Sequence, residues 1–456
     1  MKSIFLAVLI LPYFSFSADL TTNKYKFGAF GEITVYAKSA TPQSLILFAS
    51  GDGGWNQGVV DMAKSITDEK TAVAGFSTVT YLKNSDSGKK CLYPAGDLEL
   101  LSKYLQKKLN FKSYDHPVLV GYSSGATLVY GSLAQAPDGT FQGALSLGFC
   151  SDIETKNIFC KGFGLTSRKL INTKGFDLDP AQRDMSTWIT LHGDQDKVCA
   201  LSDIQKFVSA TNGAALVPLS KVGHGFSVQK NWMPQFLGGI FKIRENNKSI
   251  QLKGDLKDLP LVFYPASDAK SDTMVVFLSG DGGWAGFDKS FADAFIKDGI
   301  PVVGFNSLKY FWIAKTPEQG AEDLNRIIES LRIKWKRDKV IVVGYSFGAD
   351  VAPFFISRLP ASTKKLVSKV VLLSVGKTAD FEFHFTDWVR NSSEGQLIAP
   401  EVSKLSQPIK VYCLYGEDEA EESGCPGMKS KGVFVKSFSG GHHFDSKTAE
   451  LYKFIK

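Results

Sequence analysis

The sequence lacks several features that would place it at once in a large class of proteins. After residue 16, no segment is long and apolar enough to cross a bilayer, so we expect the remaining chain to span no membrane. Its 53 basic and 46 acidic residues leave a net charge of +7, and no Lys/Arg run dominates, which disfavours a nucleic-acid partner. The six cysteines do not have zinc-site spacing, and the Gly-rich loops do not continue into Gly-Lys-Ser/Thr. We therefore expect no metal and no cofactor.

The N-terminus has the pattern of a secretory signal. One positive charge, Lys2, precedes a short apolar run from Ile4 to Phe16, and Ser15, Ser17 and Ala18 are small residues of the kind that signal cleavage prefers. We predict a signal peptide over residues 1–18, cut after Ser17 or Ala18, and a periplasmic mature chain. An anchor that is never cut is the alternative.

Six cysteines in an exported chain favour disulfides. The most economical pairing joins Cys413 to Cys425 and Cys150 to Cys160, which leaves Cys91 for Cys199. Reduced, buried thiols are the alternative.

The second half of the chain repeats the first. Three blocks recur in the same order, at residues 48–55 and 277–284, 118–126 and 341–349, and 223–226 and 441–444. The repeat predicts two domains, residues 19–243 and 244–456, with the polar stretch 244–258 as a linker.

Each half alternates short apolar runs with longer stretches of helical pattern. In the second half the expected strands are 261–264, 274–278, 301–305, 340–343, 370–373, 409–414 and 433–438. Such alternation favours a mostly parallel sheet flanked by helices. The expected fold is α/β, with two tandem α/β-hydrolase-type domains.

A Gly-Tyr-Ser-Xaa-Gly sequence follows an apolar strand in each half, centred on Ser123 and Ser346. This is the pattern of a nucleophile elbow, in which glycines allow a sharp turn that exposes the serine at the carboxyl end of the sheet. Both serines are candidate nucleophiles.

An acid and a histidine follow each serine in the order that this fold requires. In the first half they are Asp196 and His224. In the second half the histidine is His442, and the acid is Glu419 by its offset from the preceding glycine or Asp418 by a shift of one residue. A serine needs a base to take its proton and a carboxylate to orient that base, so the pattern indicates acyl transfer.

Stabilising the oxyanion of such a reaction requires backbone N–H donors. One is expected from the residue after each serine, Ser124 or Phe347. The other is expected from the Gly-Asp-Gly-Gly-Trp loops, which contribute Gly53 and Gly54 in the first half and Gly280, Asp281, Gly282, Gly283 and Trp284 in the second. Alternatively, these glycines serve backbone geometry alone.

Two further features of the second half lie near the expected site. The segment 379–384 carries Asp380 and His384, which could bind substrate, although a structural role for His384 is the stronger reading. The acidic loop 417–422 is either a solvated surface or an attraction for a cationic substrate group.

Three motifs of the second half, Leu-Ser-Gly-Asp-Gly-Gly-Trp, Val-Gly-Tyr-Ser-Phe-Gly-Ala-Asp and Ala-Asp-Phe-Glu-Phe-His, resemble the VirJ domain of bacterial virulence proteins. The two-half layout resembles the longer AcvB type. The resemblance implies a periplasmic protein that hydrolyses aminoacylated phosphatidylglycerol, the lysyl ester in particular, with Ser346 as nucleophile. It also implies a role in membrane lipid homeostasis and virulence, with an aminoacylated anionic phospholipid as partner.

Three alternatives stay open. The first domain is either a second active site or a docking module that keeps a triad-like skeleton. The protein could instead be a carboxylesterase for other esters, or a non-catalytic periplasmic adaptor that binds secretion machinery or exported proteins.

Overall fold

The computed structural model describes residues 19–85, 90–171, 174–183, 185–246, 256–266, 271–383, 395–405, 408–428 and 431–456. The expected signal peptide, residues 1–18, lies outside these ranges. No helix within them has the length and apolar character needed to cross a bilayer.

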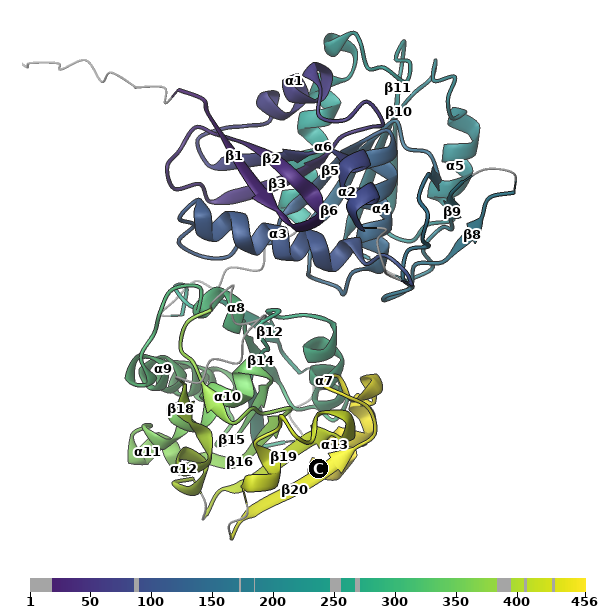
Figure 1. Ribbon diagram of the computed structural model, residues 1–456. Helices are drawn as coiled ribbons and strands as arrows, with labels where there is room; N and C mark the ends of the chain where they lie inside the picture. Colours follow the sequence, from purple (N-terminus) through teal and green to yellow (C-terminus); the bar gives the residue numbers. More distant parts are fainter. Residues whose placement is uncertain are drawn as a thin grey trace, which may run out of the picture.

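The first half is built on an eight-stranded sheet (Figure 1). In spatial order its strands are β1 (Thr21–Phe27), β2 (Gly31–Ala37), β4 (Thr71–Phe76), β3 (Ser44–Ala49), β5 (Val118–Tyr122), β6 (Gly143–Leu147), β10 (Thr187–Gly193) and β11 (Ala214–Leu219). Strand β2 runs antiparallel to both neighbours, and the pairs from β4 to β11 are all parallel.

The second half repeats this sheet without its outermost strand. The order is β12 (Leu261–Tyr264), β14 (Val302–Phe305), β13 (Thr273–Leu278), β15 (Lys339–Tyr345), β16 (Val367–Leu373), β19 (Lys410–Gly416) and β20 (Val433–Phe438). Only β12 is antiparallel to its neighbour. All seven predicted strands are present, and each half has the α/β-hydrolase fold.

The sheets are buried on both faces because successive strand residues point to opposite sides. In β15, Val340 and Val342 join one apolar cluster, whereas Ile341 and Val343 join the cluster on the opposite face. The same division applies to the first sheet. This pattern explains why the strands appear in the sequence as continuous apolar runs.

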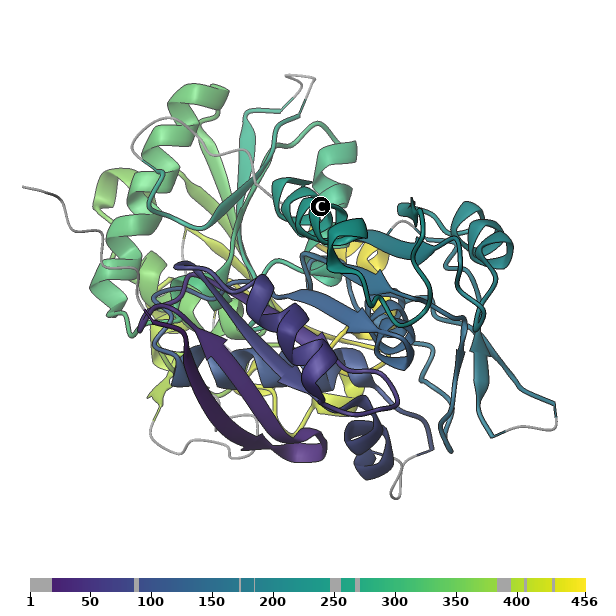
Figure 2. The same cartoon turned by 90° about the horizontal axis from the view of Figure 1, so that it is seen from above.

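Helices supply the outer layers (Figures 1 and 2). On the first sheet, α1 (Gln57–Ser65) and α6 (Met233–Asn246) cover one face, and α2 (Thr78–Ser85), α3 (Pro94–Lys108), α4 (Ser124–Gln135) and α5 (Leu201–Ser209) cover the other. On the second, α7 (Gly286–Lys297) and α13 (Thr448–Ile455) lie opposite α8 (Ser307–Tyr310), α9 (Pro317–Trp335), α10 (Phe347–Ser357) and α12 (Ile398–Ser403). Smaller elements are α11 (Ala361–Lys364) and the short strands β7 (Asp152–Ile153), β8 (Ser167–Lys169), β9 (Phe176–Leu178), β17 (Thr378–Ala379) and β18 (Gln396–Leu397). Helix α6 extends into the expected linker and ends at Asn246.

The disulfide from Cys413 to Cys425 is confirmed, but the other two predicted pairs are wrong. Cys150 pairs with Cys199, and Cys91 pairs with Cys160. Cys150 follows β6 and Cys199 follows β10, and these two strands are parallel neighbours. The carboxyl ends of the two strands therefore lie at the same edge of the sheet, although the cysteines are 49 residues apart in the sequence. Proximity in sequence was therefore a poor guide to proximity in space.

The two halves contact each other where α3 and the residues just after it meet Trp312 and Glu382 of the second half. Trp312, just after α8, donates its indole N–H to the carbonyl of Phe111 at 2.8 Å. Lys107 of α3 donates to the Trp312 carbonyl at 2.7 Å and lies 3.4 Å from Glu382. The ring of Phe383 stacks on Trp312 with centroids 5.6 Å apart. Residues 382–383 are therefore held against the first half.

Candidate active site

Both candidate nucleophiles stand on sharp strand-to-helix turns. Ser123 follows β5 with φ 54°, and Ser346 follows β15 with φ 52°, a left-handed conformation that is unfavourable for a residue with a side chain. The flanking glycines make the turn possible. A Cβ on Gly344 would lie 2.5 Å from the carbonyl oxygen of Gly348, and one on Gly348 would lie 2.2 Å from that of Leu278.

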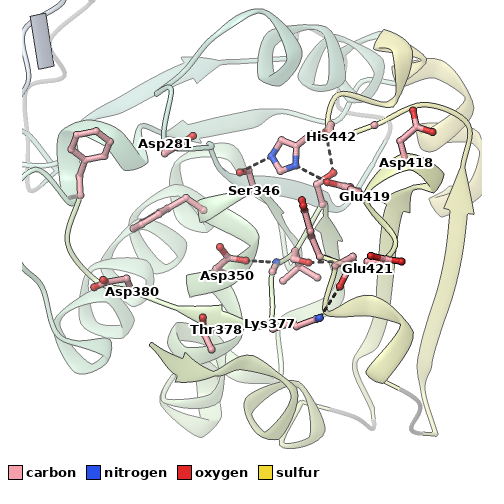
Figure 3. Close-up of a pocket in the computed structure, with 18 of the residues that line it drawn as sticks. Asp281, Ser346, Asp350, Lys377, Thr378, Asp380, Asp418, Glu419, Glu421 and His442 are labelled. Carbon is pink, nitrogen blue, oxygen red and sulfur yellow. Dashed lines mark hydrogen bonds and ion pairs between the residues drawn. The ribbon is translucent and has the colours of Figure 1, made fainter. Parts of the chain in front are cut away.

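The second half brings serine, histidine and acid into one hydrogen-bonded chain (Figure 3). His442 Nε2 lies 2.8 Å from Ser346 Oγ, and His442 Nδ1 lies 2.7 Å from Glu419 Oε2. The other carboxylate oxygen, Glu419 Oε1, accepts the backbone N–H of Gly416 at 3.0 Å. This is the geometry required for a histidine to take the serine proton while a carboxylate holds the ring.

The charge of Glu419 and its hydrogen bond to His442 favour the protonated form of this histidine. Burial alone would lower the pKa of His442, but the hydrogen bond and the charge of Glu419 outweigh it, and the pKa is raised above 6.5. For Glu419, burial would raise the pKa, yet the hydrogen bond from His442 leaves it lowered. Since 43% of the His442 side chain is exposed, solvent screens part of this coupling.

Of the two candidate acids, Glu419 rather than Asp418 contacts the histidine. The backbone N–H of Asp418 donates to the carbonyl of Gly440 at 3.1 Å, and its side chain faces the same pocket from a neighbouring position. The residue expected from its offset from Gly416 is thus the one whose carboxylate contacts His442.

The first half has the same geometry. His224 Nε2 lies 3.0 Å from Ser123 Oγ, and His224 Nδ1 lies 2.7 Å from Asp196 Oδ2. Asp196 Oδ1 accepts the backbone N–H groups of Val198 and Cys199. Burial would raise the pKa of Asp196, but the hydrogen bond from His224 leads the interactions that lower it. All three predicted residues of this half are thus brought together.

The Gly-rich loops lie against the nucleophiles. A Cβ on Gly280 would lie 3.5 Å from the Cβ of Ser346, and one on Gly51 would lie 3.0 Å from that of Ser123. The N–H groups of Gly54 and Gly283 close the turn by donating at 3.0 Å to the carbonyls of Gly51 and Gly280. These two predicted donors are therefore used inside the loop.

Phe347 and Ser124 are the first residues of α10 and α4, where backbone N–H groups have no partner inside the helix. Each therefore has a backbone N–H next to its serine that makes no hydrogen bond within its helix.

The side chain of Trp284 packs into the protein core instead of lying on the surface of the Gly-rich loop. Its side chain is 5% exposed and packs over Gly304, and its indole N–H donates to the hydroxyl of Tyr264 at 2.9 Å. A Cβ on Gly304 would lie 2.6 Å from the Trp284 ring, so this glycine is needed to seat the indole. The side chain of Trp284, the last residue of the predicted oxyanion loop, therefore belongs to the apolar core of the second half.

A cavity of about 970 Å³ opens beside Ser346 (Figure 3). Its lining is strongly acidic and includes eight carboxylates: Asp281, Asp350, Asp380, Glu382, Asp418, Glu419, Glu421 and Glu422. Lys377 is the one Lys or Arg among the described lining residues, and its ammonium donates to the carbonyl of Glu421 at 2.7 Å. Phe347, Val375 and Phe383 add apolar surface.

Two residues predicted to bind substrate have different outcomes. Asp380 lines the cavity, and its Oδ1 also accepts the backbone N–H groups of Phe381 and Glu382. His384 lies outside the described residues. Asp350 was not singled out from the sequence, although it ends the Phe-Gly-Ala-Asp motif, because the motif gave no sign that its side chain faces the cavity.

The profile of the family described as bacterial virulence protein (VirJ) matches residues 43–149 and 272–455. The chain belongs to the VirJ family. The matched segments contain both serine turns together with Glu419 and His442. In a comparison with curated proteins, no sequence matches this VirJ-family chain.

Several solved structures are similar to parts of this VirJ-family protein. The esterase domain of a Rhodothermus marinus protein is 14% identical, covers 50% of this chain and 98% of its own, and has a TM-score of 0.33. A lidless α/β serine hydrolase from Xanthomonas campestris, also 14% identical, covers 51% and 98% with a TM-score of 0.32. An esterase from Thermogutta terrifontis, again 14% identical, covers 54% and 100% with a TM-score of 0.34.

Proposed function

We propose that this protein is a serine hydrolase that cleaves the aminoacyl ester of aminoacylated phosphatidylglycerol, the lysyl ester in particular, at Ser346. The observation that carries the proposal is the acidic cavity beside a hydrogen-bonded Ser346, His442 and Glu419. An aminoacyl group is cationic, and a cavity lined by eight carboxylates attracts it.

In the proposed reaction, Ser346 Oγ attacks the ester carbonyl carbon and passes its proton to His442 Nε2. The carbonyl oxygen becomes an oxyanion, which the N–H of Phe347 and the loop at residues 280–282 stabilise. As the tetrahedral intermediate collapses, the bond to the glycerol oxygen breaks and His442 protonates that oxygen. Water then attacks the acyl-serine by the same route, releasing the amino acid and restoring Ser346.

The location proposed for this activity is the periplasm, at the outer face of the inner membrane. Three disulfides support an oxidising compartment. The substrate would present its cationic head group to the acidic cavity, and the lipid phosphate would remain outside it. The physiological consequence would be control of membrane lipid charge, which bears on virulence.

The direct test is release of free lysine from vesicles that contain lysyl-phosphatidylglycerol. The wild-type protein should release lysine, whereas Ser346→Ala should release none above background. In cells, Ser346→Ala should let the aminoacylated lipid accumulate. Equal lipid extracts from variant and wild-type strains would refute the assignment.

A second hydrolase site is proposed in the first half, because Ser123, His224 and Asp196 have the same geometry. A fluorophosphonate probe reacts with an activated serine and gives a direct test. Ser346→Ala should leave one labelled site and the Ser123→Ala, Ser346→Ala double variant none. A single labelled site in the wild type, lost in Ser346→Ala, would make the first half a docking module.

The rival classes predict different results in the same experiments. A carboxylesterase for soluble esters would hydrolyse short acyl esters and leave the aminoacyl lipid intact. A periplasmic adaptor for secretion machinery or exported proteins would not react with the probe at either serine.

A further inference from the structure

Asp350 occupies a distinctive position on α10, one helical turn after the nucleophile. Its backbone N–H donates to the carbonyl of Ser346 at 3.0 Å, and its side chain lines the cavity (Figure 3). Oδ1 accepts the backbone N–H of Gly376 at 2.7 Å. This is the one hydrogen bond that the carboxylate makes to the described residues, so Oδ2 is left facing the cavity.

Burial and nearby negative charge disfavour a charged carboxylate in this position. Burial raises the pKa of Asp350 to about 7, and the nearby charges of Asp281 and Glu419 act in the same direction against the partial relief that Gly376 and His442 provide. A bound cation would remove this penalty by pairing with the carboxylate.

The first half shows that the fold does not require an acid here. The equivalent residue, counted from the nucleophile, is Thr127, and its hydroxyl donates to the carbonyl of Cys150 at 2.6 Å. Cys150 and Gly376 are themselves equivalent, because each lies three residues after the leucine whose carbonyl accepts the serine N–H. In the first half a neutral side chain thus ties helix α4 to the equivalent loop, so a negative charge is not required for that connection.

We propose that Asp350 is the residue that selects α-aminoacyl groups, by binding the ammonium on the carbon next to the ester carbonyl that Ser346 attacks. This inference rests on the proposed function of the Ser346 site. The α-ammonium is two bonds from the attacked carbon, so it must lie near the nucleophile. Among the cavity carboxylates, Asp350 lies in the helical turn of α10 that directly follows Ser346. The carboxylate that is hydrogen-bonded to His442 is Glu419 instead.

The proposal assigns separate roles to the acidic residues. Asp350 makes the direct contact, whereas the exposed Glu421 and Glu422 act through solvent on the overall charge of the acyl group. The Ser123 site, with Thr127 in place of Asp350, has no such contact and should not distinguish α-aminoacyl esters from their deaminated analogues.

The test compares two pairs of esters of the same glycerol alcohol, in a Ser123→Ala background so that turnover comes from Ser346 alone. Alanyl and propionyl esters differ by the α-ammonium. Lysyl and 6-aminohexanoyl esters differ in the same way but both keep the distal ammonium. Asp350→Asn keeps an oxygen for the Gly376 N–H. Glu450→Gln is the control, because it removes one exposed negative charge of the same half from α13, outside the cavity lining.

Asp350→Asn should lower kcat/KM for the alanyl and lysyl esters by about 10- to 100-fold, the range for losing a hydrogen bond to a charged group. The propionyl and 6-aminohexanoyl esters should change by less than about threefold, which also shows that the triad is assembled. Glu450→Gln should change kcat/KM for all four esters by less than about threefold.

Equal losses on all four esters in Asp350→Asn would overturn the inference by giving Asp350 a general structural role. An equal loss on lysyl and 6-aminohexanoyl esters, with alanyl unchanged, would assign the carboxylate to the distal ammonium instead. Failure of the wild type to hydrolyse either aminoacyl ester would refute the proposed function itself, whatever the variants show.

Discussion

Replacing Glu419 by Gln should disable the second site through its hydrogen bonds. In the wild type Oε1 accepts from the Gly416 N–H and Oε2 lies 2.7 Å from His442 Nδ1, so the side chain needs two acceptors. A glutamine side chain offers one. If its oxygen serves Gly416, its NH₂ group faces Nδ1 and favours the tautomer with the proton on Nε2, which cannot accept the serine proton.

The opposite orientation of the introduced amide places its NH₂ group against the Gly416 N–H, two donors facing each other. An unsatisfied buried donor costs about 1–3 kcal/mol. The wrong tautomer or the unsatisfied donor, combined with loss of the carboxylate charge, should lower kcat by about 100- to 10,000-fold. This is the range seen when the orienting acid of a Ser-His-acid triad is removed. In the pH–rate profile of the residual activity, the acidic limb should lie at lower pH than in the wild type, because Glu419 raises the pKa of His442 in the wild type.

The assay is turnover of a neutral ester by the Ser123→Ala protein from pH 5 to 9. Asp418→Asn is the matched control, since it removes the neighbouring carboxylate of the same loop without touching His442, and it should change kcat by less than about threefold. Comparable losses in the two variants, or an unchanged pH profile in Glu419→Gln, would refute the reasoning.

Three further predictions concern pH, covalent structure and the turn. Because neutral His442 is the base and its pKa is raised above 6.5, the kcat/KM of the Ser346 site for a neutral ester should rise with pH through a midpoint above 6.5; a midpoint below that value would contradict the raised pKa. Replacing Cys150 and Cys199 by Ser should lower the free energy of unfolding in urea by about 2–4 kcal/mol and slow probe labelling of the first serine more than the second, and equal slowing would argue against a local effect. Gly348→Ala should abolish labelling of the second serine, because the new Cβ would lie 2.2 Å from a backbone carbonyl; normal labelling would show that the turn can relax.

The sheet and the two hydrogen-bonded groups of serine, histidine and acid could be predicted from the sequence because their signals are local. Strands buried on both faces appear as apolar runs, and the elbow needs glycines at fixed spacing. Glu419 could be identified from its offset because the repeated halves provide an internal alignment.

Features that depend on which strands are neighbours in the sheet were harder to predict from the sequence. The pairing of Cys150 with Cys199 follows from the adjacency of β6 and β10, which the sequence does not encode locally. Trp284 belongs to a conspicuous motif, but its ring turns inward because Gly304 on the next strand leaves room for it. The importance of Asp350 became visible only when the cavity and the equivalent Thr127 could be compared.

The contact between the halves has a consequence for how the protein can be divided. Glu382 and Phe383 line the cavity, yet their positions depend on Lys107 and Trp312 at the boundary between the halves. One wall of the cavity in the second half is thus held by contacts with the first half. A fragment that begins after α6 would keep Ser346, His442 and Glu419 but lose the contacts that support Glu382 and Phe383 in the cavity wall. Such a fragment should keep the ability to react at Ser346 while its selectivity among substrates changes.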